Sequence, residues 1–421
     1  MTLRRNILAN YVGIGMVALA PILALPWYLA ELGPKQFGLM SFVIMLQAVL
    51  GLFDAGMSQA LVREIVVRLD RTERGLRSTA ALLFGFERIY WLFALCAGCV
   101  TLALADSIAT YWLKLGDTPV ELGLIAIYGA AAIFAAQFPG SIYRSLLVGA
   151  QAQVKLSGIM FGSALLRHLG GVAIVTIWPT LTSYLIWQTA VALLETLVRA
   201  KFAWDIVGIK RSQVGWEIKE LSSALKLVIS MSVAVWLGAL TVQMDKIVLS
   251  RMASIEQFGY YAIAATVAVG ILQLIYPLLQ AILPRAVQVR DDPFALRSLY
   301  FKTFRLIGVM IVLGVLFFGI AGEWMLHFWL KNAPVVEAVY PVLKVLLVGT
   351  ILNAIYNIGY INWIAHEKTY RILHVNALAL VLSMALIPPL VTWQGTIGAA
   401  FGWLVINLIG FVLSLDWLKK K

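Results

Sequence analysis

Long apolar runs, separated by short polar segments, follow one another along the whole chain of 421 residues. The runs are continuously apolar and do not alternate with polar residues, which argues against membrane β-strands of about ten residues. Most have the roughly 20 residues that an α-helix needs to cross a bilayer. The pattern therefore indicates an all-α membrane protein of about twelve transmembrane helices. We predict helices over residues 7–30, 36–61, 79–104, 119–145, 156–178, 180–204, 226–250, 258–283, 303–328, 337–362, 370–391 and 396–417.

The composition leads to the same class of protein. Hydrophobic residues make up 61% of the chain and charged residues 13%, with a mean hydropathy of +0.88. A soluble domain carries about a quarter charged residues, so this chain cannot cover a water-facing surface. The apolar run that follows Arg4 and Arg5 is longer than the core of a signal peptide, and we expect it to remain as the first helix.

Lysine and arginine are unevenly distributed between the two sets of loops. With the N-terminus in the cytoplasm, the inside loops and helix ends hold 25 of the 33 basic residues. The outside loops hold four, at Lys35, Lys114, Arg251 and Lys331. The positive-inside rule therefore predicts a multi-pass protein with both termini in the cytoplasm. It also accounts for the net charge of +12 without nucleic acid as a partner. The longest inside loop, residues 63–78, is either part of this solvated basic surface or a contact for anionic headgroups.

A short repeat relates the two halves of the chain. Gln36-Phe37-Gly38 opens the second predicted helix and Gln257-Phe258-Gly259 opens the eighth, 221 residues later (257 minus 36). Both copies follow short outside loops and share one orientation. We therefore predict two six-helix lobes, residues 1–210 and 211–421, related by an axis along the membrane normal and surrounding a central cavity.

Three motifs resemble those of bacterial polysaccharide flippases of the Wzx type. They are Leu-Gly-Leu-Phe-Asp-Ala-Gly-Met at 50–57, Tyr-Arg-Ser-Leu-Leu-Val-Gly-Ala-Gln at 143–151, and Gln-Met-Asp-Lys-Ile-Val-Leu-Ser at 243–250. The resemblance implies the fold shared with multidrug (MATE) exporters and the lipid II flippase MurJ. It also implies the bacterial plasma (inner) membrane and a substrate, undecaprenyl-diphosphate-linked oligosaccharide, moved from the inner to the outer leaflet. Membrane lipids and other polysaccharide assembly proteins are the partners expected with it.

Basic residues inside predicted helices are candidates for substrate binding, because a buried cation needs water, an acid or an anionic ligand. Arginine suits a diphosphate, since its planar guanidinium binds phosphate through two donors. We therefore expect Arg88 and Arg167 to face the substrate, Arg167 in particular because no acid lies one helical turn away. Lys246 and Lys344 are further candidates. The alternatives are structural ion pairs and, for Lys344, snorkelling to the outer interface.

Acidic residues in the helices are candidates for coupling to H⁺ or Na⁺. We consider Asp54, Glu87 and Asp245 for this role. Asp54 fits a coupling ion and a hydrogen bond to backbone near Gly56 equally well. Asp245 directly precedes Lys246 and is suited to pair with it. Glu195 and Arg199 are spaced i, i+4, which favours a structural ion pair.

Uncharged polar residues form stripes on three predicted helices, and each stripe marks one polar face. Such a face either lines an aqueous path for sugar hydroxyls or makes hydrogen bonds between helices. The substrate-binding candidates among them are Gln47, Gln273, Asn353 and Asn357. The full stripes are Gln47, Gly51 and Asp54; Gln273, Tyr276 and Gln280; and Asn353, Tyr356, Asn357 and Tyr360.

The sequence has no signature of an enzyme or a cofactor site. It lacks a Walker A loop, H-E-x-x-H and G-x-S-x-G. The four histidines are scattered, and Cys96 and Cys99 lie in an apolar run without a second metal half-site. The resemblance thus implies a flippase, which we expect to work by alternating access, without cofactor or metal. One alternative is a MATE-like multidrug or cation antiporter, whose cationic substrates call for an acidic or apolar cavity. The other is an oligosaccharide polymerase or ligase, for which the outside loops are short.

Overall fold

The computed structural model describes residues 3–54, 56–69, 72–215 and 218–418. These residues form two compact units, Met1–Ala239 and Leu240–Lys421, and the boundary falls within helix α10 (Ile218–Met252). We call them the N-terminal and the C-terminal unit and describe each by itself. All regular elements in the described residues are helices.

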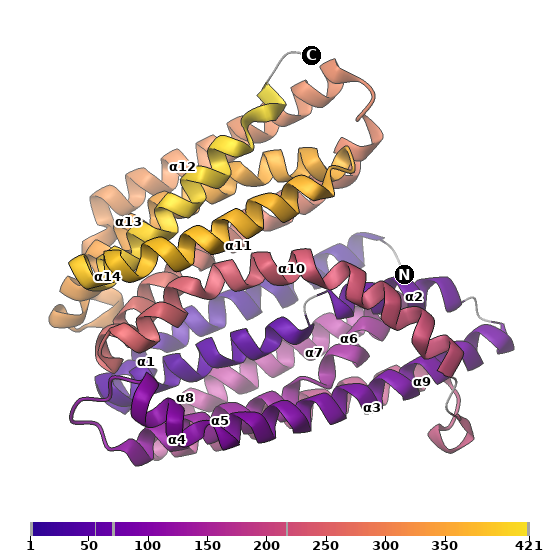
Figure 1. Ribbon diagram of the computed structural model, residues 1–421, viewed down its shortest axis with the longest axis horizontal. Coiled ribbons are helices and arrows are strands. Elements are labelled where there is room, and N and C mark those ends of the chain that lie inside the picture. The colour runs from indigo at the N-terminus through magenta and orange to yellow at the C-terminus, as the bar shows by residue number, and fades with distance from the viewer. Residues whose placement is uncertain (1–2, 55, 70–71, 216–217, 419–421) are drawn as a thin grey trace. The chain divides into compact units, whose positions relative to one another are not determined.

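The N-terminal unit is a bundle of long helices (Figure 1). Helix α5 packs against α9 and α3, and α1 packs against α5 and α7. Its core includes the fully buried Phe86, Tyr90, Ile142 and Leu146. The elements are α1 (Leu3–Gly51), η1 (Leu52–Asp54), α2 (Met57–Arg68), α3 (Glu73–Ala103), α4 (Ala105–Ser107), η2 (Ile108–Trp112), α5 (Val120–Gln137), α6 (Gly140–Gly149), α7 (Gln153–Leu165), η3 (Leu166–Gly170), α8 (Gly171–Ile177), α9 (Leu181–Val207), η4 (Arg211–Gln213) and the first part of α10.

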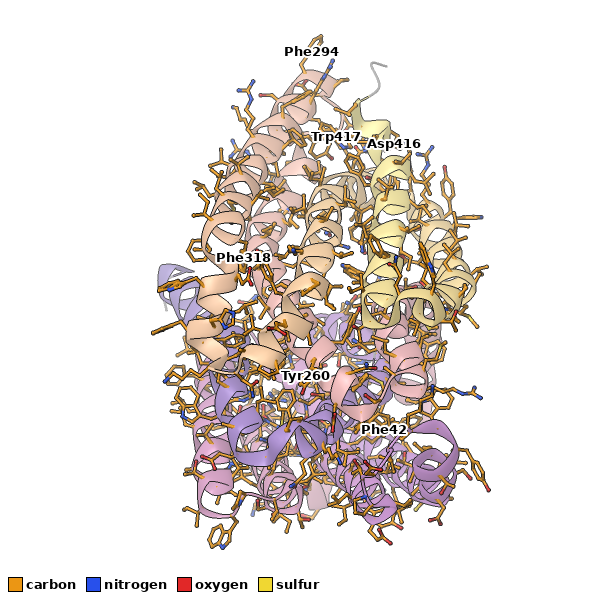
Figure 2. The ribbon with its side chains drawn as sticks, turned by 90° about the vertical axis from the view of Figure 1, so that its left-hand side faces the viewer. Phe42, Tyr260, Phe294, Phe318, Asp416 and Trp417 are labelled. Atoms are coloured by element: carbon orange, nitrogen blue, oxygen red, sulfur yellow. The ribbon has the colours of Figure 1, made fainter. Side chains whose placement is uncertain are left out.

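The C-terminal unit is built around α13, which packs against α11, α12 and α14. The aromatic rings of Tyr300 and Phe301 lie against Trp417 at one end of the unit. Figure 2 shows Asp416 and Trp417 near the end of the unit where Phe294 lies, with Phe318 farther along α12. The elements are the last part of α10, α11 (Ile255–Gln288), α12 (Pro293–Leu330), α13 (Ala333–Ala365), α14 (Thr369–Leu413) and η5 (Leu415–Leu418).

Two glycines divide the longest helices. Gly33 in α1 and Gly395 in α14 have φ of 70° and 59°, a conformation that glycine adopts without steric cost. Each of these helices therefore contains two helical segments. In the described part of the chain, nine helices are long and apolar enough to cross a membrane. Dividing α1 and α14 at these glycines gives eleven (9 plus 2), which is consistent with the prediction of about twelve.

Some predicted helix boundaries were wrong. The predicted helix 36–61 is interrupted at η1, and 119–145 is interrupted before Gly140, where Pro139 cannot donate a backbone hydrogen bond. Much of the predicted loop 63–78 is helical, because α2 continues to Arg68 and α3 begins at Glu73, with the Thr72 side chain as its N-cap.

The two copies of Gln-Phe-Gly occupy matching local positions. Gln36 is the third residue after the break at Gly33 (36 minus 33), and Gln257 is the third after the N-cap Ser254 (257 minus 254). Phe37 and Phe258 are both fully buried. The local structure thus agrees with a repeat, while the symmetric relation of the halves stays a prediction.

Candidate functional site

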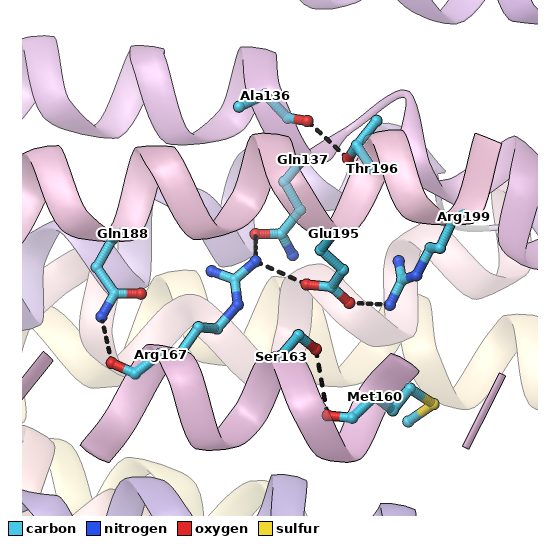
Figure 3. Close-up of polar contacts among 9 residues, drawn as sticks. All are labelled: Ala136, Gln137, Met160, Ser163, Arg167, Gln188, Glu195, Thr196 and Arg199. Atoms are coloured by element: carbon cyan, nitrogen blue, oxygen red, sulfur yellow. Dashed lines mark hydrogen bonds and ion pairs between the residues drawn. The ribbon is translucent and has the colours of Figure 1, made fainter. Parts of the chain in front are cut away.

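Arg167 lies in a buried polar cluster of the N-terminal unit (Figure 3). Its Nη2 donates to Glu195 Oε2 at 2.9 Å and to Gln137 Oε1 at 3.4 Å. Glu195 also pairs with Arg199, one helical turn later on α9, as the i, i+4 spacing predicted. The side chains of Arg167, Glu195 and Arg199 are 16%, 9% and 12% exposed. Two guanidinium groups therefore share one carboxylate, which leaves the cluster with one excess positive charge.

The backbone around Arg167 forms a single π-helical turn, η3, between α7 and α8. Such a turn disturbs the regular i→i−4 hydrogen bonds, and π-turns are frequent at functional sites. The carbonyl oxygen of Arg167 accepts from Gln188 Nε2 (3.0 Å) and from the Tyr28 hydroxyl (3.2 Å). The same hydroxyl lies 3.2 Å from the carbonyl oxygen of His168. Side chains from α1 and α9 thus hold the turn that carries Arg167.

A small cavity lies beside this cluster. Its polar lining comes from Gln47, Gly51 and Asp54 on one side and from Gln137 and Ser141 on the other. The structure thus brings the polar stripe predicted for residues 47–54 to one cavity, and Gln137 belongs to both the cavity and the arginine cluster. Its volume of ≈ 110 Å³ has room for several waters.

In the described residues, Asp54 accepts hydrogen bonds from side-chain hydroxyl groups. The Ser58 hydroxyl lies 2.8 and 2.7 Å from its two carboxylate oxygens, and the Tyr90 hydroxyl donates at 2.7 Å. Asp54 is therefore fixed at the edge of the cavity by two hydroxyl groups.

Glu87 and Arg88 have different surroundings, as expected for neighbours about 100° apart on a helix. Glu87 is buried, accepts from the Tyr143 hydroxyl at 2.5 Å and pairs with Arg211. The Arg88 side chain is exposed, with its guanidinium 3.9 Å from the centre of the Phe84 ring. The structure thus gives Glu87 the features of a structural ion pair and places Arg88 at the unit's surface.

The charged candidates of the C-terminal unit also have partners. Lys246 Nζ lies 3.2 Å from Asp245 Oδ1, as the adjacent positions suggested. Asp245 is buried and accepts from the Tyr261 hydroxyl at 2.6 Å. Lys344 is exposed, with Nζ 4.6 Å from the centre of the Tyr340 ring.

The asparagines of α13 form a hydrogen-bonded chain that reaches α14. Asn357 Nδ2 donates to Asn353 Oδ1 (3.1 Å), and Asn353 Nδ2 donates to Asn407 Oδ1 (2.7 Å). These contacts correspond to the interhelical alternative for this stripe. Gln273 is half-buried on α11, and the side chains of Tyr276 and Gln280 lie outside the described residues.

Sequence reasoning missed Gln137, Ser141, Tyr28 and Gln188. Of these four residues, Gln137 could have been predicted from the sequence, because it is an isolated amide at the end of an apolar stretch of α5. The acid that pairs with Arg167 was also missed, since it comes from another helix, 28 residues away in sequence. Within the described residues, no group of three or more His, Cys, Asp or Glu side chains is placed to hold a metal ion.

Comparisons with known proteins agree with this architecture. Residues 31–333 match the family described as "Polysaccharide biosynthesis protein". A Shigella flexneri protein described as "Putative O-antigen transporter" is 23% identical over 439 residues, covering 100% of this chain and 98% of the relative.

Two solved structures have a similar fold. One, described as lipid II flippase MurJ in an inward closed conformation, has a TM-score of 0.79 and 15% identity, covering 99% of this chain and 87% of that one. The other is a multidrug resistance MATE family transporter of the MOP superfamily in an inward-facing conformation. It has a TM-score of 0.71 and 14% identity, covering 98% and 94%. The predicted resemblance and fold class are thus confirmed, and the chain belongs to the polysaccharide biosynthesis protein family.

Proposed function

We propose that this protein is a flippase for undecaprenyl-diphosphate-linked oligosaccharide, an O-antigen or related surface polysaccharide repeat unit. It moves this substrate from the inner to the outer leaflet of the bacterial plasma membrane. The family and the relative described as an O-antigen transporter support a flippase for lipid-linked polysaccharide. The proposed mechanism is alternating access by two lobes, residues 1–210 and 211–421, with other polysaccharide assembly proteins as partners.

The arginine cluster carries the proposal. A diphosphate that leaves water needs donors to replace its hydration, and guanidinium groups provide them in pairs. Among the ion pairs of the described residues, Arg167 and Arg199 share the single carboxylate of Glu195, so an anionic ligand can complete the charge balance of the cluster. Arg167 is the one that also contacts Gln137 at the cavity. Among the other predicted substrate residues, Arg88 and Lys344 lie on the surface of their units, and Lys246 pairs with the adjacent Asp245.

Coupling to H⁺ or Na⁺ is assigned to Asp54 within this proposal. Asp54 is the acidic residue of the cavity that Gln137 shares with Arg167. The cavity's size and its oxygen-bearing residues fit an ion or waters. Glu87 and Asp245 are the secondary candidates, because each already pairs with a basic side chain.

The likeness to a MATE transporter favours a second candidate, export of cationic drugs. Its substrates would require acidic or apolar groups free to bind them. The excess charge of the Arg167 cluster is positive, which opposes this reading.

Arg167→Ala tests the proposal. We expect it to abolish surface glycan while membrane-embedded protein stays abundant, because Glu195 keeps Arg199 as a partner. Arg167→Lys should restore glycan only partly, since lysine keeps the charge but loses the planar fork. Arg77→Ala is the matched control, because it removes an arginine from an exposed pair with Glu73.

Normal glycan in Arg167→Ala at normal abundance would remove Arg167 from the substrate site. A drug-efflux assay in the same strains separates the two candidates. Loss of efflux of a cationic dye on deletion of the protein, with glycan unchanged, would favour the exporter.

A further inference from the structure

The C-terminal unit has a second cavity, of ≈ 340 Å³, which the transport site does not use. Its polar lining comes from Tyr370, Arg371 and His374, in the first turns of α14. Its apolar lining includes Val375 and Leu378, one to two turns further along the same helix. The cavity is therefore polar at the helix end and apolar towards the middle of the unit.

The polar part of the cavity is rigidly built. Arg371 pairs with Asp416, and Asp416 also accepts from Trp363 Nε1 at 3.0 Å. The single carboxylate engages only part of the guanidinium, which has five N–H donors, and the Arg371 side chain is 38% exposed. His374 Nδ1 is 2.6 Å from the carbonyl oxygen of Tyr370 and therefore donates to it, so Nε2 can donate to another partner only in the imidazolium form. Arg371 thus offers oriented donors to an anion, and the imidazolium form of His374 adds one more.

The apolar part is suited to hydrocarbon. Leu378 and Leu413 each remain 43% exposed. Arg371 and Leu378 are seven residues apart, which is about 10 Å along a helix. A ligand with an anionic group and a flexible apolar chain can contact both at once.

Basic residues near the cavity favour an anionic ligand. Arg290, Arg297 and Lys368 lie at the helix ends on this side of the unit. Basic clusters beside a membrane helix attract anionic lipids. We propose that this cavity binds an anionic glycerophospholipid of the surrounding bilayer, with its phosphate on Arg371 and His374 and an acyl chain along Leu378 and Leu413. This assignment is independent of the substrate that the protein transports.

Native mass spectrometry of the full chain in detergent, titrated with phosphatidylglycerol or phosphatidylcholine, tests the site. We expect the wild type to prefer phosphatidylglycerol. The double variant Arg371→Gln/Asp416→Asn removes the cation together with its acid, so no uncompensated charge stays behind. It should weaken phosphatidylglycerol binding about fivefold and phosphatidylcholine binding less, because the choline cation offsets the attraction of that lipid's phosphate to Arg371.

Two further variants complete the experiment. Leu378→Asn should weaken both lipids, because it makes the chain site polar, and its abundance in membranes shows whether the variant folds. Lys331→Asn removes a positive charge from the opposite end of α12, where the residue has φ of 51°, and asparagine adopts this conformation readily. It should bind both lipids like the wild type.

Unchanged phosphatidylglycerol binding in both the double variant and Leu378→Asn would overturn the assignment. A competition experiment with undecaprenyl phosphate could also overturn it. If undecaprenyl phosphate displaces phosphatidylglycerol at a concentration below the one at which phosphatidylglycerol binds, the cavity is a site for the carrier lipid. Surface glycan is measured in the same variants as a separate readout of transport, so that failure of the lipid assignment can be distinguished from failure of the transport proposal.

Discussion

Glu195 is the residue on which the charge balance of the arginine cluster depends. It is the acid shared by Arg167 and Arg199, and its side chain is 9% exposed. Removing one partner of a buried ion pair costs more than the pair itself contributes, because the remaining charge is uncompensated.

We therefore predict that Glu195→Gln lowers the free energy of unfolding by about 3–5 kcal/mol. Arg167→Ala should lower it by less. Glu195→Gln leaves two neighbouring cations without an acid, whereas Arg167→Ala leaves an intact pair. Thermal unfolding of the purified variants and their abundance in membranes measure the difference. Partial rescue is expected from Arg199→Gln in the Glu195→Gln background, and a Glu195→Gln protein as stable as the wild type would contradict the prediction.

Asp54→Asn separates charge from hydrogen bonding at the cavity. The amide oxygen can still accept from the hydroxyl groups of Ser58 and Tyr90, but the negative charge is lost. We expect normal abundance and a transport rate that no longer responds to an imposed Na⁺ or H⁺ gradient. The measurement is substrate flipping in proteoliposomes with and without each gradient. Glu87→Gln serves as a comparison, and a full gradient response in Asp54→Asn would exclude Asp54 as the coupling site.

At the scale of elements, hydropathy predicted where helices lie but not where they bend. Apolar residues surround the interruptions at Leu52–Asp54 and Pro139 and the π-turn at Leu166–Gly170, so hydropathy averaged over about twenty residues does not reveal them. The polar stripe at 47–54 was detectable, since its residues share one helical face. That Gln137 and Ser141, on α5 and α6, line the other side of the cavity could not be predicted. Contacts between helices have no fixed spacing in the sequence.

Close helix packing gives a test at this scale. A Cβ at Gly359 of α13 would lie 2.3 Å from the carbonyl oxygen of Ser414, so the chain after α14 would have to move. We predict that Gly359→Ala destabilises the C-terminal unit by about 1–3 kcal/mol. Gly314→Ala on α12 is the matched control, because its Cβ would meet no atom within 4 Å and alanine favours a helix. Thermal unfolding in detergent compares the two, and equal stability of both variants would show that the contact is not tight.

At the scale of the molecule, α12 faces outwards from its unit. Only 6% of its most apolar stretch is buried, while its mean hydropathy there is 2.4. A surface of this kind is stable in hydrocarbon and not in water. The composition of the chain and the packing of its helices thus agree on a multi-pass membrane protein.

The orientation in the membrane can be tested from the C-terminal unit. Contacts between Arg290 and Glu367 and between Arg371 and Asp416 bring the ends of α11, α13 and η5 to one end of the unit. Lys331 follows α12, whose 38 residues extend about 57 Å at 1.5 Å per residue, so it lies at the opposite end.

Because most basic residues of this unit gather at the first end, we predict that end to be cytoplasmic. Reporter fusions after Lys421 and at Asp291 should both read cytoplasmic, and a fusion at Lys331 should read external. The Asp291 fusion controls for effects of the chain terminus, since it lies between α11 and α12. Matching readouts at Lys331 and Lys421 would refute the predicted topology, and with it the direction of transport that we propose.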